Sequence, residues 1–283
     1  MIISLTSIPP RFPALHRTLE TLLAQSETVD GIFLYLPKVY RRFGPCESVP
    51  RVPNGVEIRR LDEDFGPATK LLGALEDYRS TNVPILFCDD DHYYHRDWVR
   101  RFRRAGETRP ADCIVERGYL LDDLIDTYYS GHRQPRPAMR ARRRKRAIDR
   151  VRGWLSPREA PHRRFRCWYE SSGFVDQIGG WGGVLVRPDF FTNDIFDIPD
   201  QMWMVDDAWI SGHLEKNGIG IWLNAEGISP VSHEGSTTEA LLTNEVGGAR
   251  RDEANLAAIR YFRETYGIWM EEAGMEPALV RSA

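Results

Sequence analysis

Three consecutive carboxylates, Asp89, Asp90 and Asp91, stand directly after the apolar run 83–88. Adjacent anions repel one another unless a cation lies among them. Carboxylate and water oxygens are the ligands that hard divalent ions prefer, so the expected occupant is Mg²⁺ or Mn²⁺ carrying a phosphorylated ligand. The alternative is an acidic turn that meets only solvent.

A second acidic pair, Asp206 and Asp207, begins a segment in which Val205, Trp209 and Leu214 have helical spacing. A carboxylate acts as a general base when it is partly desolvated and within hydrogen-bond reach of its substrate. The alternative is that the two acids only complement the dipole of the helix. Either way, the spacing predicts a helix over 204–214.

Two other segments have side chains suited to binding. Four glycines in 179–183 surround Trp181, and such a backbone can approach a ligand closely beside a flat apolar ring. Lys70 lies one turn into a predicted helix, where its charge would add to a phosphate site at the helix N-terminus. For the glycine-rich segment, the alternative is a tight turn before a strand, with Trp181 in the core. For Lys70, the alternative is a solvated charge on the helix surface.

Strands that alternate with helices must position these side chains. Short apolar runs predict strands over 2–5, 31–36, 56–61, 83–88, 113–115, 173–175, 184–186 and 218–223. Apolar spacing predicts helices over 13–25, 68–78, 98–104, 204–214 and 252–269. This alternation predicts an α/β fold with a mixed, mostly parallel sheet flanked by helices, whose loops after the strands share one edge.

The composition is that of an ordinary globular protein. The chain has 283 residues, 42% hydrophobic and 28% charged, and we expect one domain over 1–283. Its four cysteines form no C-x-x-C pair, which argues against a zinc ribbon or a redox dithiol. The N-terminus has no basic segment of the kind that begins a secretory signal, so we expect a cytoplasmic protein.

The net charge of −3 hides a strong asymmetry. The segment 133–166 contains 14 Arg or Lys residues and two acids, whereas the rest of the chain has 24 bases and 39 acids. Such a block is typical of an interaction surface or an insertion. We interpret 133–166 as an Arg-rich insertion within the domain.

Taken in order, the strand that ends in a D-x-D triplet, the glycine-rich loop, the acidic pair and a later histidine resemble the GT-A glycosyltransferases. The chain is similar in particular to bacterial family-2-like enzymes of polysaccharide or lipopolysaccharide assembly. The resemblance covers 2–235 apart from the Arg-rich insertion, and it implies a Rossmann-like GT-A fold. It also implies a nucleoside diphosphate-sugar donor and a glycan or lipid-linked acceptor.

The resemblance implies a metal site. Asp91 would coordinate Mn²⁺ or Mg²⁺ between the two phosphates of the donor, and Asp89 or Asp90 would hold the ribose or the metal's water. Asp89 is also a candidate metal ligand. His233 matches the C-terminal histidine of the family and is the candidate second ligand.

Catalytic and donor-binding roles follow from the same resemblance. Asp207 matches the acid that accepts the acceptor's proton in inverting members. Asp206 stands where the family usually has Glu, so both acids remain candidates for the base. The implied donor contacts are Thr6, Arg11, Asp64, Lys70, Asp89, Asp90, Gly180, Trp181 and Gly182.

Two other functions are compatible with these residues. One is a phosphoesterase or nuclease with paired metal ions, although a single dense carboxylate cluster is visible. The other is a protein that binds an anionic polymer through 133–166. The acidic body argues against nucleic acid, and we expect this segment to contact anionic lipids at the inner face of the cell membrane or an acidic glycan.

Overall fold

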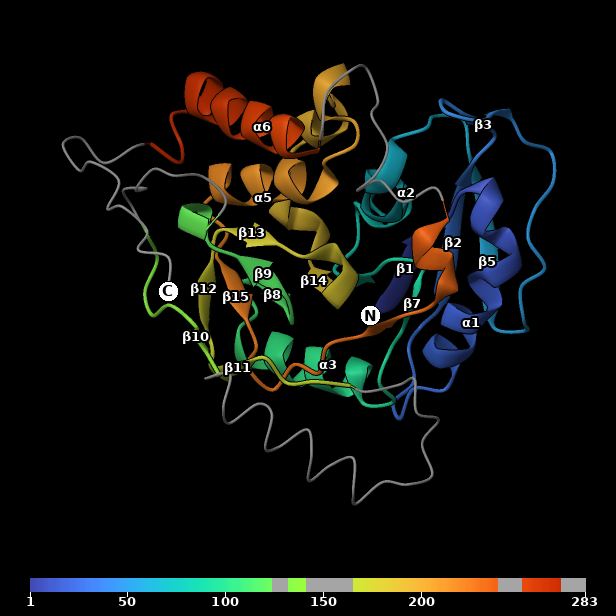
Figure 1. Cartoon of the computed structure of the whole chain (residues 1–283), viewed down its shortest axis with the longest axis horizontal. Helices are drawn as coiled ribbons and strands as arrows, with labels where there is room; N and C mark the ends of the chain where they lie inside the picture. Colours follow the sequence, from blue (N-terminus) through green and yellow to red (C-terminus); the bar gives the residue numbers. More distant parts are fainter. Residues whose placement is uncertain (124–131, 141–164, 239–250, 271–283) are drawn as a thin grey trace.

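The computed structural model describes residues 1–123, 132–140, 165–238 and 251–270. At its centre lies an eight-stranded mixed sheet (Figure 1). In spatial order the strands are β12 (Gly173–Val175), β15 (Ile221–Leu223), β8 (Cys113–Val115), β14 (Val184–Val186), β6 (Ile85–Phe87), β1 (Ile2–Thr6), β2 (Ile32–Pro37) and β5 (Val56–Leu61). Four of the seven pairings are parallel. The predicted α/β class with a mixed, mostly parallel sheet is therefore confirmed.

Helices cover both faces of this sheet. One face carries α1 (Phe12–Leu23) and α3 (Trp98–Thr108), and the other carries α2 (Thr69–Tyr78), α5 (Asp206–Lys216) and α6 (Arg251–Tyr266). Strand β1 shows the cause, because Ile3 and Leu5 pack on the α1 side whereas Ile2 packs on the α2 side. Because successive side chains of this strand point to opposite faces of the sheet and apolar ones lie on both, helices must pack on both faces to keep them from water.

The strands at the centre of the sheet come from distant parts of the chain. Strand β14 runs antiparallel between β6 and β8, an arrangement that the apolar pattern did not predict. In the described ranges, four short antiparallel pairs surround the sheet. They are β3 (Val39–Tyr40) with β4 (Gly44–Pro45), β7 (His92–Tyr93) with β16 (Val231–Ser232), β9 (Gly118–Tyr119) with β13 (Gln177–Ile178), and β10 (Ala138–Met139) with β11 (Tyr169–Ser171).

The Arg-rich insertion is described only at its two ends. Residues 133–140, 165 and 166 belong to the described part of the chain, and 141–164 lie outside it. Across the described ranges, no helix has both the length and the apolar character that a bilayer crossing requires.

Candidate active site

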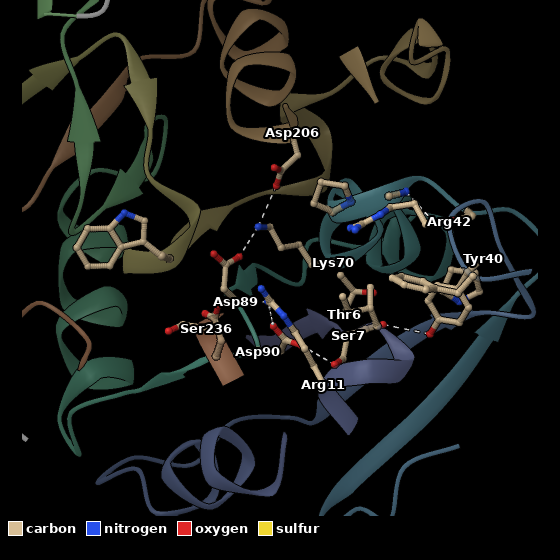
Figure 2. A pocket seen from close by; sticks show the side chains of 18 of the residues that line it. Thr6, Ser7, Arg11, Tyr40, Arg42, Lys70, Asp89, Asp90, Asp206 and Ser236 are labelled. Atoms are coloured by element: carbon tan, nitrogen blue, oxygen red, sulfur yellow. Dashed lines mark hydrogen bonds and ion pairs between the residues drawn. The ribbon is translucent and has the colours of Figure 1, made fainter. Parts of the chain in front are cut away.

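A cavity of about 440 Å³ lies where β1 and β6 end, beside the first turns of α2 and α5 (Figure 2). Because β1 and β6 are parallel neighbours, with Ser4 opposite Phe87, the residues that follow them meet at one edge of the sheet. Ligands of α/β sheets bind at such an edge. The predicted site residues that line the cavity are Thr6, Arg11, Asp64, Lys70, Asp89, Asp90, Asp91, Trp181, Asp206 and Asp207.

The three carboxylates of the triplet point to different partners. Asp90 receives hydrogen bonds from Ser7 and from Arg11, the latter at 2.8 Å. Arg11 also lies 3.1 Å from Asp91, whose other oxygen accepts a 2.5 Å hydrogen bond from His92 Nδ1. Burial would raise the pKa of Asp91, but His92 and Arg11 lower it overall. Arg11 therefore offsets part of the triplet's charge and is already engaged by Asp90 and Asp91.

Lys70 joins the two acidic groups (Figure 2). Its Nζ lies 2.5 Å from Asp89 Oδ1 and 2.9 Å from Asp206 Oδ2, and the residue is 4% exposed. Burial would lower the pKa of this ammonium, but Asp206, Asp89 and Asp207 raise it well above its ordinary value. Lys70, predicted as a phosphate contact, is thus paired with carboxylates. Its charge links Asp89 of the triplet to Asp206 of α5.

Asp207 is held by the glycine-rich loop. The N–H of Gly180 donates to Asp207 Oδ1 at 3.0 Å, and the hydroxyl of Ser211 donates to the Asp207 carbonyl at 2.6 Å. A Cβ at position 180 would lie 2.8 Å from Asp207 Oδ1 and 2.9 Å from Lys70 Nζ. Gly180 therefore positions the acid pair without lining the cavity itself.

Trp181 is the member of this loop that faces the cavity. Its ring stacks with His92 at 5.6 Å between centroids and 25° between planes, and its Nε1 donates to Tyr119 at 3.2 Å. Gly182 does not line the cavity. A Cβ there would lie 2.4 Å from Arg117 Cγ, so this glycine accommodates Arg117.

His233 lies near the triplet but outside the cavity lining. The N–H of Gly235 donates to its Nδ1 at 3.0 Å, so the proton is on Nε2, which donates to Thr18 Oγ1 at 3.0 Å. Burial lowers the pKa of His233. Both ring nitrogens are engaged in this arrangement, so a metal ion would have to displace one of these contacts.

Thr6 and Asp64 lie on the β1 side of the cavity. The hydroxyl of Thr6 donates to the carbonyl of Tyr35 at 2.8 Å. Asp64 accepts from the N–H groups of Arg41 at 2.7 Å and Gly66 at 2.8 Å, while burial raises its pKa. The backbone donors fix this carboxylate at the cavity wall.

Several lining residues were not predicted: Ser7, Tyr40, Arg42, Phe43, Trp203, His92, Ser232 and Ser236. Tyr40 donates to the carbonyl of Ser7 at 3.1 Å, and Trp203 Nε1 donates to the carbonyl of Asp64 at 2.9 Å. The second contact places the indole of Trp203 beside Asp64, and the first holds the ring of Tyr40 beside Ser7. Tyr40 and Trp203 lie in separate segments, and neither has a motif that marks it in the sequence.

The charge of the lining suits a divalent cation. Six carboxylates line the cavity, whereas the Arg and Lys side chains there are Arg11, Arg42 and Lys70. In the described ranges no three His, Cys, Asp or Glu side chains form a ready metal cage. Mg²⁺ is commonly held by one or two carboxylates together with substrate phosphates, so Asp89 and Asp91 could hold such an ion without a cage. The ion would have to displace Arg11 or His92 from Asp91.

No protein-family model and no curated protein matches this chain. Among solved structures it is similar to S. aureus TarS, with a TM-score of 0.45 and 11% identity over 94% of this chain and 43% of that chain. For TarS 1-349 the TM-score is 0.43, with 12% identity over 94% and 71% of the two chains. For TarS 1-349 in complex with UDP it is 0.45, with 10% identity over 93% and 72%. The present chain thus spans less than half of the first TarS chain.

Proposed function

We propose that this chain is a metal-dependent GT-A glycosyltransferase of cell-surface polysaccharide synthesis. It would move a sugar from a nucleoside diphosphate-sugar to a glycan or lipid-linked acceptor. The observation that carries the proposal is that the triplet after β6 and the acids of α5 line one cavity, joined by Lys70 at 2.5 and 2.9 Å. Donor binding and proton abstraction can therefore occur at adjacent positions.

The donor would occupy the β1 side of the cavity. The rings of Tyr40 and Trp203 offer flat faces to a nucleobase, and Asp89 and Asp91 would hold Mn²⁺ or Mg²⁺. The bound ion supplies Lewis-acid neutralisation of the diphosphate leaving group. Because six aspartates line the cavity against Arg11, Arg42 and Lys70, the described cations of the lining only partly neutralise it.

Asp207 is the proposed general base. It would accept the proton of the acceptor hydroxyl while that oxygen bonds to the anomeric carbon and the bond to the diphosphate breaks, which inverts the configuration. The N–H of Gly180 fixes one carboxylate oxygen of Asp207, and Lys70, whose pKa Asp207 helps to raise, lies nearby. Asp206 lies in direct ion contact with Lys70, which leaves Asp207 as the first choice.

The geometry favours this function over a two-metal phosphoesterase. Two-metal sites hold their ions about 3.5–4 Å apart between converging ligands. Here the Lys70 ammonium occupies the space between Asp89 and Asp206 where a second ion would lie. Binding of an anionic polymer or membrane through 133–166 remains a prediction, since most of that segment lies outside the described residues.

Thermal unfolding with a panel of nucleotide-sugars and Mn²⁺ tests the proposal. At about 100 times its Kd, a donor should stabilise the protein by about 2.7 kcal/mol and raise the Tm by about 5 °C or more. Asp91→Asn should lose the Mn²⁺-dependent part of this shift. A panel in which no nucleotide-sugar raises the Tm, while a phosphodiester does, would reject the proposal in favour of the hydrolase.

A further inference from the structure

Arg117 lies in an aromatic cage beside the cavity. It stands between β8 and β9 and is 8% exposed. Its guanidinium carbon is 4.4 Å from the ring centre of Trp168, 4.6 Å from that of Trp181 and 5.6 Å from that of Tyr169. A planar cation is thus held mainly by the faces of aromatic rings.

Among the residues that the structure describes, this cation has no anionic partner. Its Nε and Nη1 atoms are buried without a hydrogen-bond acceptor. The neighbouring carboxylate, Glu116, is engaged by Arg101 at 2.6 and 2.8 Å, and burial lowers the pKa of Arg117. Burying an unpaired charge is unfavourable, and ring faces compensate only part of that cost. The missing counter-charge points to a ligand.

The cage adjoins the proposed active site through one shared ring. Trp181 contacts Arg117 and also lines the cavity, where it stacks with His92. The glycine-rich loop is shaped around the same cation, because a Cβ at Gly182 would lie 2.4 Å from Arg117 Cγ. A Cβ at Gly179 would lie 3.1 Å from Arg117 Cβ. The loop therefore places Arg117 one indole ring from the cavity.

We propose that Arg117, together with Trp168 and Trp181, binds an oxyanion carried by a sugar unit of the acceptor. The inference rests on the proposed glycosyltransferase function and names the acceptor's chemical class, an acidic or phosphorylated glycan. The guanidinium fork matches the two oxygens of a carboxylate or phosphate. The half-buried ring of Trp168, which lies beside this fork, would pack against the C–H surface of the sugar.

Titration of the intact protein with three sugars, followed by tryptophan fluorescence, tests this inference. The probes are glucuronate, glucose 6-phosphate and neutral methyl glucoside, all without a nucleotide-sugar. We expect at least one anionic sugar to bind ten-fold or more tightly than methyl glucoside. The tighter of the two anionic sugars shows whether the site prefers a carboxylate or a phosphate. Equal affinity for all three sugars overturns the inference, and this comparison needs no variant.

Arg117→Met assigns the binding to this side chain, because methionine keeps an apolar stem between the rings. In the variant, the ratio of the affinity for the anionic sugar to that for methyl glucoside should fall at least ten-fold. The affinity for methyl glucoside itself should equal that of the parent. An unchanged anion preference overturns the inference. Since no donor is present, a failed nucleotide-sugar panel would reject the proposed reaction without affecting this result.

Discussion

Lys70 and Arg117 are two buried cations beside the same cavity, and their surroundings are opposite. Lys70 lies among Asp89, Asp206 and Asp207, which raise its pKa. Arg117 lies among aromatic rings, and burial lowers its pKa. The first charge is balanced by the protein itself, whereas no described side chain supplies a counter-ion to the second. The difference indicates that Lys70 organises the site and that Arg117 receives something from outside.

The largest expected effect concerns Asp207, the proposed general base near Lys70. Asp207→Asn removes the proposed base, and loss of a general base typically slows a reaction by about 10²–10⁴-fold. Transfer should fall by that factor, while the thermal shift caused by the nucleotide-sugar and Mn²⁺ should persist. Initial transfer rates and Tm values measured on the same preparations check both expectations. Equal transfer rates in the variant and the parent would refute the base assignment.

The next largest effect compares the two cations directly. Lys70→Met leaves the buried Asp206 and the half-buried Asp89 without their ammonium partner. Breaking a buried ion pair on one side costs about 3–5 kcal/mol, and the contact with Asp206 is of that kind. Arg117→Met leaves no carboxylate unpaired, so its free energy of unfolding should change far less. Urea unfolding of both variants measures the difference.

A charge-matched variant serves as the control for Lys70. In Lys70→Met combined with Asp206→Asn, one unpaired carboxylate is also removed, so part of the lost stability should return. If the double variant is no more stable than Lys70→Met, the ion pairs do not account for the loss. The contrast between the two cations would then have to be abandoned.

His213 shows a third response of a basic group to burial. It is fully buried beside Trp209 and Phe262, and burial lowers its pKa from 6.5 to about 4. Between those values the unfolded chain binds the proton and the folded chain does not, so stability falls as the pH drops from 6.5 to 4. The loss should reach about 3 kcal/mol.

Unfolding of the parent and of His213→Gln at pH 7 and at pH 4.5 measures this contribution. The stability difference between the two proteins should shift in favour of the variant at the lower pH, because glutamine does not titrate. Asp194, which lies 3.9 Å from His213 Nδ1, has its pKa lowered to about 2 and therefore titrates below this window. Identical pH dependence in both proteins would show that His213 stays neutral for another reason.

The sequence predicted the elements of the fold better than the contacts of the site. Strands such as β1 and helices such as α1 follow from local apolar spacing, and the triplet could be placed at a strand end for the same reason. The position of β14 depends on pairing between distant segments, which spacing does not encode. The partners of Lys70 and the isolation of Arg117 likewise depend on which side chains meet after folding.

The smallest expected effects come from two glycines of one loop, each against a different cation. Gly180→Ala would bring a methyl group to 2.8 Å from Asp207 Oδ1, and Gly182→Ala would bring one to 2.4 Å from Arg117 Cγ. Overpacking of this kind costs about 1–3 kcal/mol. Gly180→Ala should slow transfer more than it weakens sugar-anion binding, and Gly182→Ala should do the reverse. Transfer rates and glucuronate titrations of both variants test this. If the loss of transfer rate and the loss of glucuronate affinity stand in the same ratio in both variants, the two cations form one functional unit.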